Sequence, residues 1–304
     1  LNDVRPIPLK EKSRWSAKIA QDQFVSSVEL LPPPGHDASR ILERSKDLYS
    51  AKVDAINIPD GPRASARMSA IMTAVLIEQK VGIETVLHYT CRDRNLLGMQ
   101  SDMLGAQAMG LRNMLLVTGD PPKMGSYPDA TGVFDVDAIG LTNMVHQLNS
   151  GLNLGKRPIG EPCSLSVGVG VNPVHRDFKY EMRRFEWKVK AGAEWAITQP
   201  VFDLDSLYSF MDYCSSHNLN IPIVAGIWPL VSYRNAVFMK NEVPGVVVPD
   251  SLVERMARFD DPEEAKKEGV EIACEMAHKL RSSVAGIQVS APFGRIDLAL
   301  KVLS

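Results

Sequence analysis

Cysteine is scarce in this chain, and its spacing argues against two kinds of site. The four cysteines are scattered and form no Cys-x-x-Cys pair; they are Cys91, Cys163, Cys214 and Cys274. Neither a disulfide framework nor a zinc knuckle is therefore indicated. A reducing compartment fits this pattern, so we expect a cytoplasmic protein. The six histidines show no metal-ligand spacing either, and we expect no metal.

Long apolar runs are also missing. No stretch approaches the roughly 18–20 apolar residues that cross a bilayer, and the N-terminal segment is polar and mixed in charge rather than signal-like. We therefore expect neither a membrane partner nor secretion. The chain opens on Leu1 instead of Met, which is compatible with trimming for expression or with a module cut from a longer polypeptide.

An excess of either charge is absent as well. The formal net charge is −2, which supplies no electrostatic reason to expect nucleic acid or an anionic membrane as a partner. We expect a small-molecule substrate. With 304 residues, 45% of them hydrophobic, the chain can bury the core of one large α/β domain or of two small ones.

What the sequence does contain is an alternation of Val- and Ile-rich runs with longer helical patterns. This alternation predicts parallel strands joined by crossover helices, and eight strands are the number that closes a (β/α)8 barrel of the TIM type. The expected strands are Phe24–Leu30, Ala55–Ile58, Glu84–Thr90, Asn113–Thr118, Ser164–Val171, Trp195–Thr198, Ile221–Ala225 and Gly286–Ser290. The expected helices are Ser39–Ala51, Ser65–Gln79, Leu96–Met109, Val136–Leu148, Arg176–Lys190, Leu204–Ser216 and Arg295–Leu303.

No linker or repeat interrupts this pattern, so residues 1–304 are expected to form a single domain, with 1–22 as an N-terminal extension or helix. The interval from Val231 to Ala285 has room for two or three extra helices before the last strand. The rival architecture, a dinucleotide-binding doubly wound sheet, requires Gly-x-Gly-x-x-Gly. The nearest match, Gly168-Val-Gly-Val-Asn-Pro173, has proline at the third glycine, so a nucleotide cofactor would have to bind through loops at the barrel rim.

Three polar side chains lie at the ends of expected strands and are followed within a few residues by proline, which cannot continue a central strand. They are Glu29, Asp120 and Gln199. The C-terminal ends of barrel strands converge on one pocket, where such enzymes place their chemistry. We therefore expect these three side chains to share a site.

Each of the three has a plainer interpretation. Burial among apolar neighbours would raise the pKa of Glu29 toward the range of a general acid, but a salt bridge to a loop cation is the alternative. Asp120 follows a glycine that allows close approach of a flat ligand, or it is a turn or helix-cap aspartate. Gln199 offers both a donor and an acceptor to a heterocycle, or it is a satisfied rim amide.

Other polar and sulfur-containing residues point less specifically to function. His88 and His175 fall at or just after strand ends, where a hydrogen bond to a cofactor or a loop is a better expectation than a metal. Met99, Met103 and Met109 follow helical spacing loosely and are expected to pack in the core.

Six segments in order closely resemble the methylenetetrahydrofolate reductase family, from about residue 24 to the C-terminus. They are Glu29-Leu-Leu-Pro-Pro, His88-Tyr-Thr-Cys-Arg-Asp93, Thr118-Gly-Asp-Pro121, Lys188-Val-Lys-Ala-Gly-Ala193, Ile197-Thr-Gln199 with Phe202-Asp203, and Gly226-Ile-Trp-Pro229. The resemblance implies a (β/α)8 barrel that binds FAD and reduces 5,10-methylenetetrahydrofolate to 5-methyltetrahydrofolate. NADH or NADPH would reduce the flavin first and leave, in a ping-pong sequence that serves one-carbon metabolism and methionine biosynthesis.

The resemblance also implies roles for individual residues. Glu29 would be the acid that protonates the leaving amine nitrogen, and Asp120 would stabilise the cationic iminium. Gln199, Tyr233 and Arg295 would contact the folate. The positions implied for FAD are His88, Thr118, Gly119, Asp120, His175 and Lys188, with weaker matches at Asp60, Glu181 and Arg184.

The chain departs from the family pattern in three places. Thr118 replaces a common arginine, so a phosphate contact is lost or moved to Lys188, Arg183 or Arg184. The usual Ala-Tyr-Pro or Gly-Tyr-Pro after the fifth strand is replaced in Gly170-Val-Asn-Pro173, and Asp60 replaces an aromatic or polar residue. These departures bear on FAD affinity and on the electron donor.

Two alternatives to a nicotinamide-dependent reductase remain. One is a flavin-free, pterin-binding methyltransferase barrel, which would need the folate residues only. The other is a non-catalytic or partner-dependent barrel that receives electrons from another subunit. A homo-oligomer and a fused or partner methyltransferase are further expectations from the resemblance.

Overall fold

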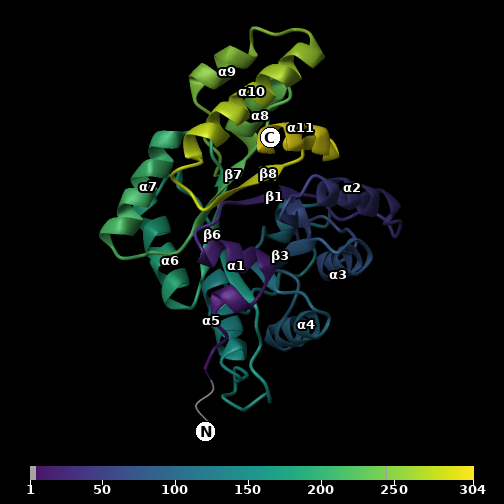
Figure 1. Ribbon diagram of the computed structural model, residues 1–304, viewed down its shortest axis with the longest axis vertical. Coiled ribbons are helices and arrows are strands. Elements are labelled where there is room, and N and C mark those ends of the chain that lie inside the picture. The colour runs from purple at the N-terminus through teal and green to yellow at the C-terminus, as the bar shows by residue number, and fades with distance from the viewer. Residues whose placement is uncertain (1–4, 244) are drawn as a thin grey trace.

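The computed structural model describes residues 5–243 and 245–304, and its centre is a closed barrel of eight parallel strands in sequential order, β1 to β8. Figure 1 shows the strands surrounded by helices. The strands are β1 (Val25–Glu29), β2 (Ala55–Ile58), β3 (Glu84–Thr90), β4 (Asn113–Val117), β5 (Ser166–Val171), β6 (Trp195–Pro200), β7 (Ile223–Ile227) and β8 (Gly286–Ser290). The (β/α)8 barrel is therefore confirmed, and every strand boundary lies within two residues of its prediction.

A helix follows each strand, and the long interval before β8 contains three of them among the described residues. The α-helices are α1 (Arg14–Ala20), α2 (Ser39–Ser50), α3 (Ala70–Val81), α4 (Leu96–Ala108), α5 (Ala138–Asn149), α6 (Phe178–Lys190), α7 (Leu204–Ser216), α8 (Tyr233–Glu242), α9 (Asp250–Met256), α10 (Pro262–Leu280) and α11 (Ile296–Leu303). Short 3-10 turns occur at η1 (Leu9–Glu11), η2 (Pro62–Ala64), η3 (Pro122–Met124) and η4 (Pro292–Gly294).

One helix, α3, begins five residues later than predicted. The pattern predicted a helix from Ser65, but α3 starts at Ala70 because Ser69 adopts an extended backbone and its side chain accepts a hydrogen bond from the Met72 amide. The segment before it forms η2, in which Arg63 and Ala64 have φ values of 56° and 48°. Such left-handed residues cannot belong to an α-helix.

The N-terminal extension contains the helix that closes one end of the barrel. Trp15 and Ile19 of α1 are buried and pack against the inward-facing side chains at the start of the strands. The Trp15 and Trp195 rings pack edge to face, with their centroids 5.9 Å apart. Gly168 has no side chain and leaves room for the Trp195 ring. Lys12 adds an ion pair with Glu194 at 2.7 Å. Residues 1–4 of the predicted extension lie outside the described residues.

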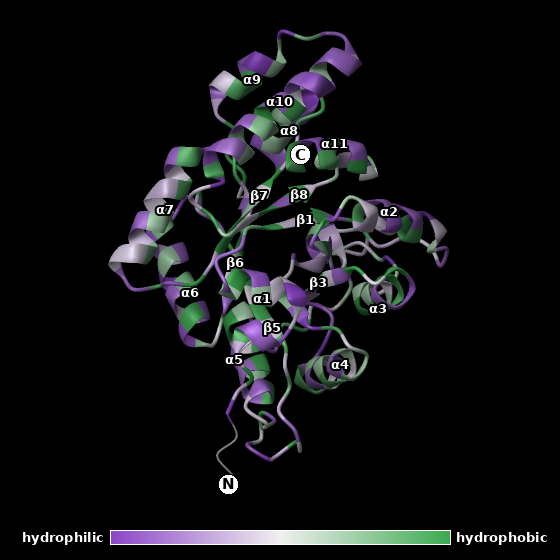
Figure 2. Ribbon diagram, viewed as in Figure 1, coloured by the Kyte–Doolittle hydropathy of each residue, from purple (hydrophilic) through white to green (hydrophobic). Residues whose placement is uncertain are grey.

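The barrel interior changes from apolar to polar along the strand direction. On β1, alternate residues of the inward face are Val25, Ser27 and Glu29, and Val25 belongs to the cluster around Trp15. A larger apolar cluster lies between the sheet and the helices, and Figure 2 shows the green hydrophobic and purple hydrophilic residues alternating around helices such as α2 and α10. The polar end of the interior is the C-terminal end of the strands.

The methionine prediction holds in part. Met99 and Met103 are fully buried on α4, whereas Met109 follows the helix and is 48% exposed, so its assignment to the core was wrong. The helix ends before Met109, and the residue turns outward there. Within the described residues, every helix is too short or too polar to span a bilayer.

Candidate active site

Glu29 lies at the C-terminal end of β1, on the seam where the barrel closes. Its register partners are Asn57 on β2 and Ser290 on β8. The side chain is mostly buried and makes no ion pair with any described residue, so the salt-bridge alternative finds no support. Burial raises the pKa of Glu29 to about 7, as the apolar setting predicted. The carboxyl group can therefore hold a proton near neutral pH.

Asn57 links Glu29 to the predicted His88. The Asn57 side chain is fully buried, and its Nδ2 lies 3.0 Å from Nε2 of His88. Burial lowers the pKa of His88 to about 4, so the imidazole is neutral in the working range. Oδ1 of Asn57 has no hydrogen-bond partner among the described residues. An unpaired buried acceptor is costly, and it suits a site that receives a ligand or a protonated group.

Two further polar side chains reach the same interior. Gln288 is 7% exposed, Ser27 is fully buried, and their Nε2 and Oγ atoms lack partners within the described chain. The sequence reasoning missed Asn57, Ser27 and Gln288. The signal was available, because each is a polar residue inside an otherwise apolar strand run. Because side chains alternate along a strand, these residues face the barrel interior, as Glu29 does.

Asp120 follows β4 on a glycine turn and is exposed at the barrel mouth. Gly119 has φ 92°, and a side chain there would bring a Cβ to 2.9 Å from Thr90 Cβ, so only glycine fits. The Asp120 carbonyl oxygen accepts a weak hydrogen bond from Arg92 at 3.4 Å, while its carboxylate makes no ion pair with the described residues. Oγ1 of Thr118 accepts a hydrogen bond from the Ala138 amide at 3.1 Å and thereby anchors α5.

Gln199 occupies the corresponding end of β6. The pairing of β6 with β7 shifts register between Ile197 and Pro200. At this irregularity the Thr198 hydroxyl donates to the Gln199 carbonyl and accepts from the Gly226 amide. The Gln199 side chain is exposed and makes no hydrogen bond within the described chain. Its amide is therefore available to a ligand and is not a satisfied rim group.

Two of the three cations predicted for the FAD phosphates, Lys188 and Arg184, already have partners, whereas Arg183 is exposed. Lys188 is buried, and its Nζ donates to the Gly170 carbonyl at 2.7 Å and lies 4.0 Å from Glu181. Burial lowers the pKa of Lys188, while Glu181 opposes that effect. Arg184 pairs with Asp137 at 2.8 Å. His175, after β5, accepts a hydrogen bond from the Asp177 amide at 3.1 Å.

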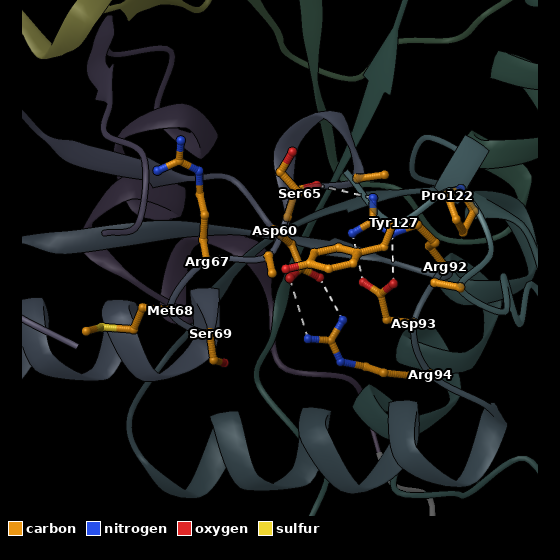
Figure 3. A pocket seen from close by; sticks show the side chains of 14 residues that line it. Asp60, Ser65, Arg67, Met68, Ser69, Arg92, Asp93, Arg94, Pro122 and Tyr127 are labelled. Atoms are coloured by element: carbon orange, nitrogen blue, oxygen red, sulfur yellow. Dashed lines mark hydrogen bonds and ion pairs between the residues drawn. The ribbon is translucent and has the colours of Figure 1, made fainter. Parts of the chain in front are cut away.

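The Asp60 carboxylate also has partners within the described chain. Its Oδ2 accepts hydrogen bonds from the amide and hydroxyl of Thr90, both at 3.1 Å, and from Arg94 at 2.7 Å. Asp60 and Arg94 line a cavity of about 340 Å³ together with Tyr127 and Arg92, and Figure 3 shows the ion pair between the first two. The Asp60 carboxylate therefore holds the β2 and β3 loops together.

Tyr233 and Arg295 lie farther out on the rim. Tyr233 is the first residue of α8 and is 46% exposed. Arg295 follows η4 and forms a two-point ion pair with Asp297, with hydrogen bonds of 2.8 and 2.7 Å. Neither residue contacts Glu29 in a hydrogen bond or ion pair, so both could meet a ligand only as it extends out of the barrel.

The predicted FAD positions come from two adjoining parts of the barrel wall. His88, Thr118, Gly119 and Asp120 come from the neighbouring strands β3 and β4, and His175, Glu181, Arg184 and Lys188 come from the next unit along the barrel. At Gly170 an added Cβ would meet only Val117, at 3.7 Å, so the interior is open there. Together with the unpaired Asn57 oxygen, this opening provides space and hydrogen bonding for a flat ligand.

Within residues 5–243 and 245–304 no group of three or more His, Cys, Asp or Glu side chains is placed to bind an ion. The four cysteines are unpaired thiols, and burial raises the pKa of Cys91 and Cys214 to about 12. These two thiols therefore stay protonated at neutral pH.

Solved structures share the fold. A protein from Clostridium thermocellum, described as uncharacterized and as binding two copies of 5-methyl-5,6,7,8-tetrahydrofolic acid, aligns over 96% of this chain and 97% of its own, with TM-score 0.65 and 16% identity. A 2,3-dimethylmalate lyase of the PEP mutase/isocitrate lyase superfamily covers 98% of this chain and 83% of its own at TM-score 0.54 and 12% identity. At these identities the likeness concerns the barrel alone.

Sequence relatives are more specific. The methylenetetrahydrofolate reductase (NADH) 1 of Arabidopsis thaliana is 26% identical over 86% of this chain, which spans only 44% of that relative. The 5,10-methylenetetrahydrofolate reductases of Pectobacterium carotovorum subsp. carotovorum and Escherichia coli are 26% and 25% identical, and the match covers 85% and 81% of their lengths. The sequence model of the family matches residues 14–290. This chain belongs to the methylenetetrahydrofolate reductase family.

Proposed function

We propose that this chain reduces 5,10-methylenetetrahydrofolate to 5-methyltetrahydrofolate, with FAD as the bound cofactor and NADH or NADPH as the electron donor in a ping-pong sequence. The observation that carries the proposal is Glu29, a carboxyl group that burial keeps protonated up to about pH 7 at the C-terminal mouth of the barrel. Family membership supplies the reaction class, and the site supplies the acid that the reaction requires.

The acid is needed because the methylene bridge of the substrate joins two nitrogens. The ring must open before the carbon can accept a hydride, and opening requires a proton on the nitrogen that leaves. Glu29 has no competing cation among the described residues, so its proton is available to a substrate amine. Asn57 and Ser290 flank it on the neighbouring strands and restrict its position.

Ring opening leaves a cationic iminium, which a nearby negative charge stabilises. Asp120 is the candidate for this role, since its residue is exposed after β4 and its carboxylate has no ion-pair partner in the described chain. Gln199 is unengaged on β6 and can hydrogen-bond the pterin edge. Tyr233 and Arg295 would contact the outer part of the folate.

Bound FAD would supply a hydride carrier between the nicotinamide and the folate. His88, Thr118, Gly119 and Asp120 would line its ring, since Gly119 lets the backbone approach closely. Lys188, Arg184, Glu181, His175 and Asp60 are the proposed outer positions. Lys188 has two further N–H donors beyond its bond to Gly170, so it can add a phosphate contact without losing that bond.

The experiment that tests this proposal is the visible spectrum of the purified protein under anaerobic conditions, before and after NADH or NADPH. Flavin bands that bleach, and that recover when 5,10-methylenetetrahydrofolate is added, are the expected result. Flavin that stays oxidised would contradict a nicotinamide donor and favour electrons from a partner protein. No bound flavin, even after FAD is added, would contradict the reductase and favour the flavin-free methyltransferase.

The cytoplasmic location, the homo-oligomer, the adjoining methyltransferase and the place in methionine biosynthesis stay predictions from the resemblance. They are independent of the site geometry.

A further inference from the structure

Asn57 and Glu29 project side by side into the barrel. They are register partners on β2 and β1, and neighbouring strands lie about 4.8 Å apart. Side chains alternate along a strand, and Val25 and Ala55 belong to the interior cluster. Glu29 lies four residues after Val25 and Asn57 lies two after Ala55, so both side chains point inward. The Asn57 carboxamide is therefore a direct neighbour of the proposed acid.

The Asn57 carboxamide has one paired atom and one unpaired atom. Nδ2 lies 3.0 Å from Nε2 of His88, whereas Oδ1 is buried without a hydrogen-bond partner among the described residues. A buried acceptor without a partner is costly, so Oδ1 requires a donor from inside the barrel. A protonated Glu29 on the adjacent strand has one O–H to donate.

The same carboxamide determines which ring nitrogen of His88 carries the proton. Burial lowers the pKa of His88 to about 4, so at neutral pH the ring has one N–H donor and one acceptor. The Nδ2 group of Asn57 can only donate, and therefore Nε2 of His88 accepts and the ring proton lies on Nδ1. This tautomer leaves an Nδ1–H donor for an acceptor atom of a bound ligand.

The groups that face Glu29 from the neighbouring strands are uncharged. Gln288 and Ser290 of β8 have no titratable side chain, and His88 of β3 is neutral. The charged residues of the adjacent strands and loops are paired or lie at the rim: Glu84 pairs with Arg14, Asp60 pairs with Arg94, and Asp120 is exposed after β4. A hydrogen bond to Asn57 can therefore add to burial in favouring the protonated form of Glu29.

We propose that Asn57 is a positioning residue, which accepts the proton of Glu29 in a hydrogen bond through Oδ1 and holds His88 in the Nδ1–H tautomer through Nδ2. The role at Glu29 rests on the proposed function, whereas the role at His88 does not. When Glu29 protonates the leaving nitrogen of the substrate, its O–H bond breaks and the electron pair stays on the carboxylate. An oxygen of Glu29 then faces Oδ1 of Asn57 with no proton between them. Their repulsion favours the return of a proton from solvent before the next turnover.

The pH profile of the folate half-reaction tests the role at Glu29. The full chain, with its flavin reduced chemically, is mixed with 5,10-methylenetetrahydrofolate at pH 6 to 9, and the rate should fall above about pH 7. Asn57→Ala should move this fall about one pH unit lower, because water that fills the space can donate to the carboxylate. Asn57→Asp keeps an acceptor and adds a negative charge, so it should leave the fall in place or move it higher. A raised KM with an unmoved pH profile would overturn the proposal and make Asn57 a substrate contact.

Nitrogen NMR of the full chain with labelled histidine tests the role at His88. Long-range proton–nitrogen correlations report the tautomer of each of the six histidines, and His88→Gln assigns the signal. The unmodified chain should show the proton on Nδ1 at pH 7, and Asn57→Ala should give a mixture of tautomers. A proton on Nε2 in the unmodified chain would overturn the proposal, because Asn57 would then turn its oxygen toward His88. This measurement needs no turnover, so a chain that fails to reduce folate would reject the proposed function and leave the role at His88 testable.

Asn113→Ala is the matched control. Asn113 is a buried asparagine on the inward face of β4, where its carboxamide accepts from the Ser13 hydroxyl and donates to the Thr85 carbonyl. Its substitution should lower stability but leave the pH profile and the His88 tautomer unchanged. A shift of the pH profile equal to that of Asn57→Ala would show that loss of any buried amide has this effect, and would overturn the specific role of Asn57.

Discussion

Nδ2 of Asn57 lies 3.0 Å from Nε2 of His88, and the register of β1 and β2 places Asn57 directly beside Glu29. The three residues form one row across the polar end of the barrel. Burial raises the pKa of Glu29 to about 7 and lowers the pKa of His88 to about 4. Both groups are therefore uncharged just below neutral pH, and a neutral interior lets the acid keep its proton until a substrate amine accepts it.

Glu29→Gln separates the two half-reactions. Reduction of the flavin by nicotinamide should proceed at close to the normal rate, whereas folate reduction should fall by on the order of 100- to 10,000-fold, because an amide cannot supply the proton. Anaerobic stopped-flow absorbance with each substrate alone measures both rates. Equal losses in the two half-reactions would refute the role of Glu29 as the acid.

The same carboxyl group predicts a pH dependence of stability. Between pH 4.5 and about 7 the folded protein keeps a proton on Glu29 that the unfolded chain has released, so the contribution of Glu29 to stability declines as pH rises through this window. Above it, the ionised buried carboxylate costs up to about 3 kcal/mol, at about 1.4 kcal/mol per pKa unit.

Glu29→Gln removes this dependence. Its free energy of unfolding, measured by urea denaturation, should gain on the unmodified chain as pH rises from 5 to 8. His88 contributes the opposite slope, between about pH 4 and 6.5, but it does so in both proteins and cancels from the difference. A difference that is flat with pH would show that the Glu29 pKa is not raised.

Asp120→Asn should act mainly on the folate half-reaction. The substitution keeps the size of the side chain and removes the negative charge that would stabilise the iminium, so folate reduction should slow by about 10- to 100-fold. Reduction of the flavin should change much less. Rapid-mixing kinetics measures both half-reactions. A variant that lost only flavin reduction by the nicotinamide would contradict the proposed role of Asp120.

Gly168→Ala tests the packing at the closed end of the barrel. The added methyl group would overlap the Trp195 ring, and overpacking of this kind costs about 1–3 kcal/mol. Gly170→Ala is the matched control, because its methyl group meets only Val117 at 3.7 Å. Urea denaturation should show a clear loss for the first variant and a small change for the second. Equal losses would mean that Trp195 does not constrain Gly168.

The amino-acid sequence by itself determined the barrel and pointed to Glu29 as the proposed acid. Strand and helix patterns depend on residues that are close together in the chain. The eight strands between Val25 and Ser290 were therefore predictable without knowledge of contacts between distant segments. The raised pKa of Glu29 was also predicted, but its sequence neighbours Val28 and Leu30 point to the opposite face of β1, so its burial comes from the barrel interior. The local pattern did not predict where α3 begins, because the Ser69 N-cap sets the start of that helix.

The tertiary structure alone decided which polar groups are free. Asp60 is held by Arg94 and Thr90, and Arg184 by Asp137, because loops distant in sequence meet at the rim. The register between strands placed Asn57 between Glu29 and His88, and the closure of β8 on β1 brought Gly294 against Arg44. Hydrogen bonds and ion pairs depend on distances of a few ångströms between remote segments, which no local pattern contains.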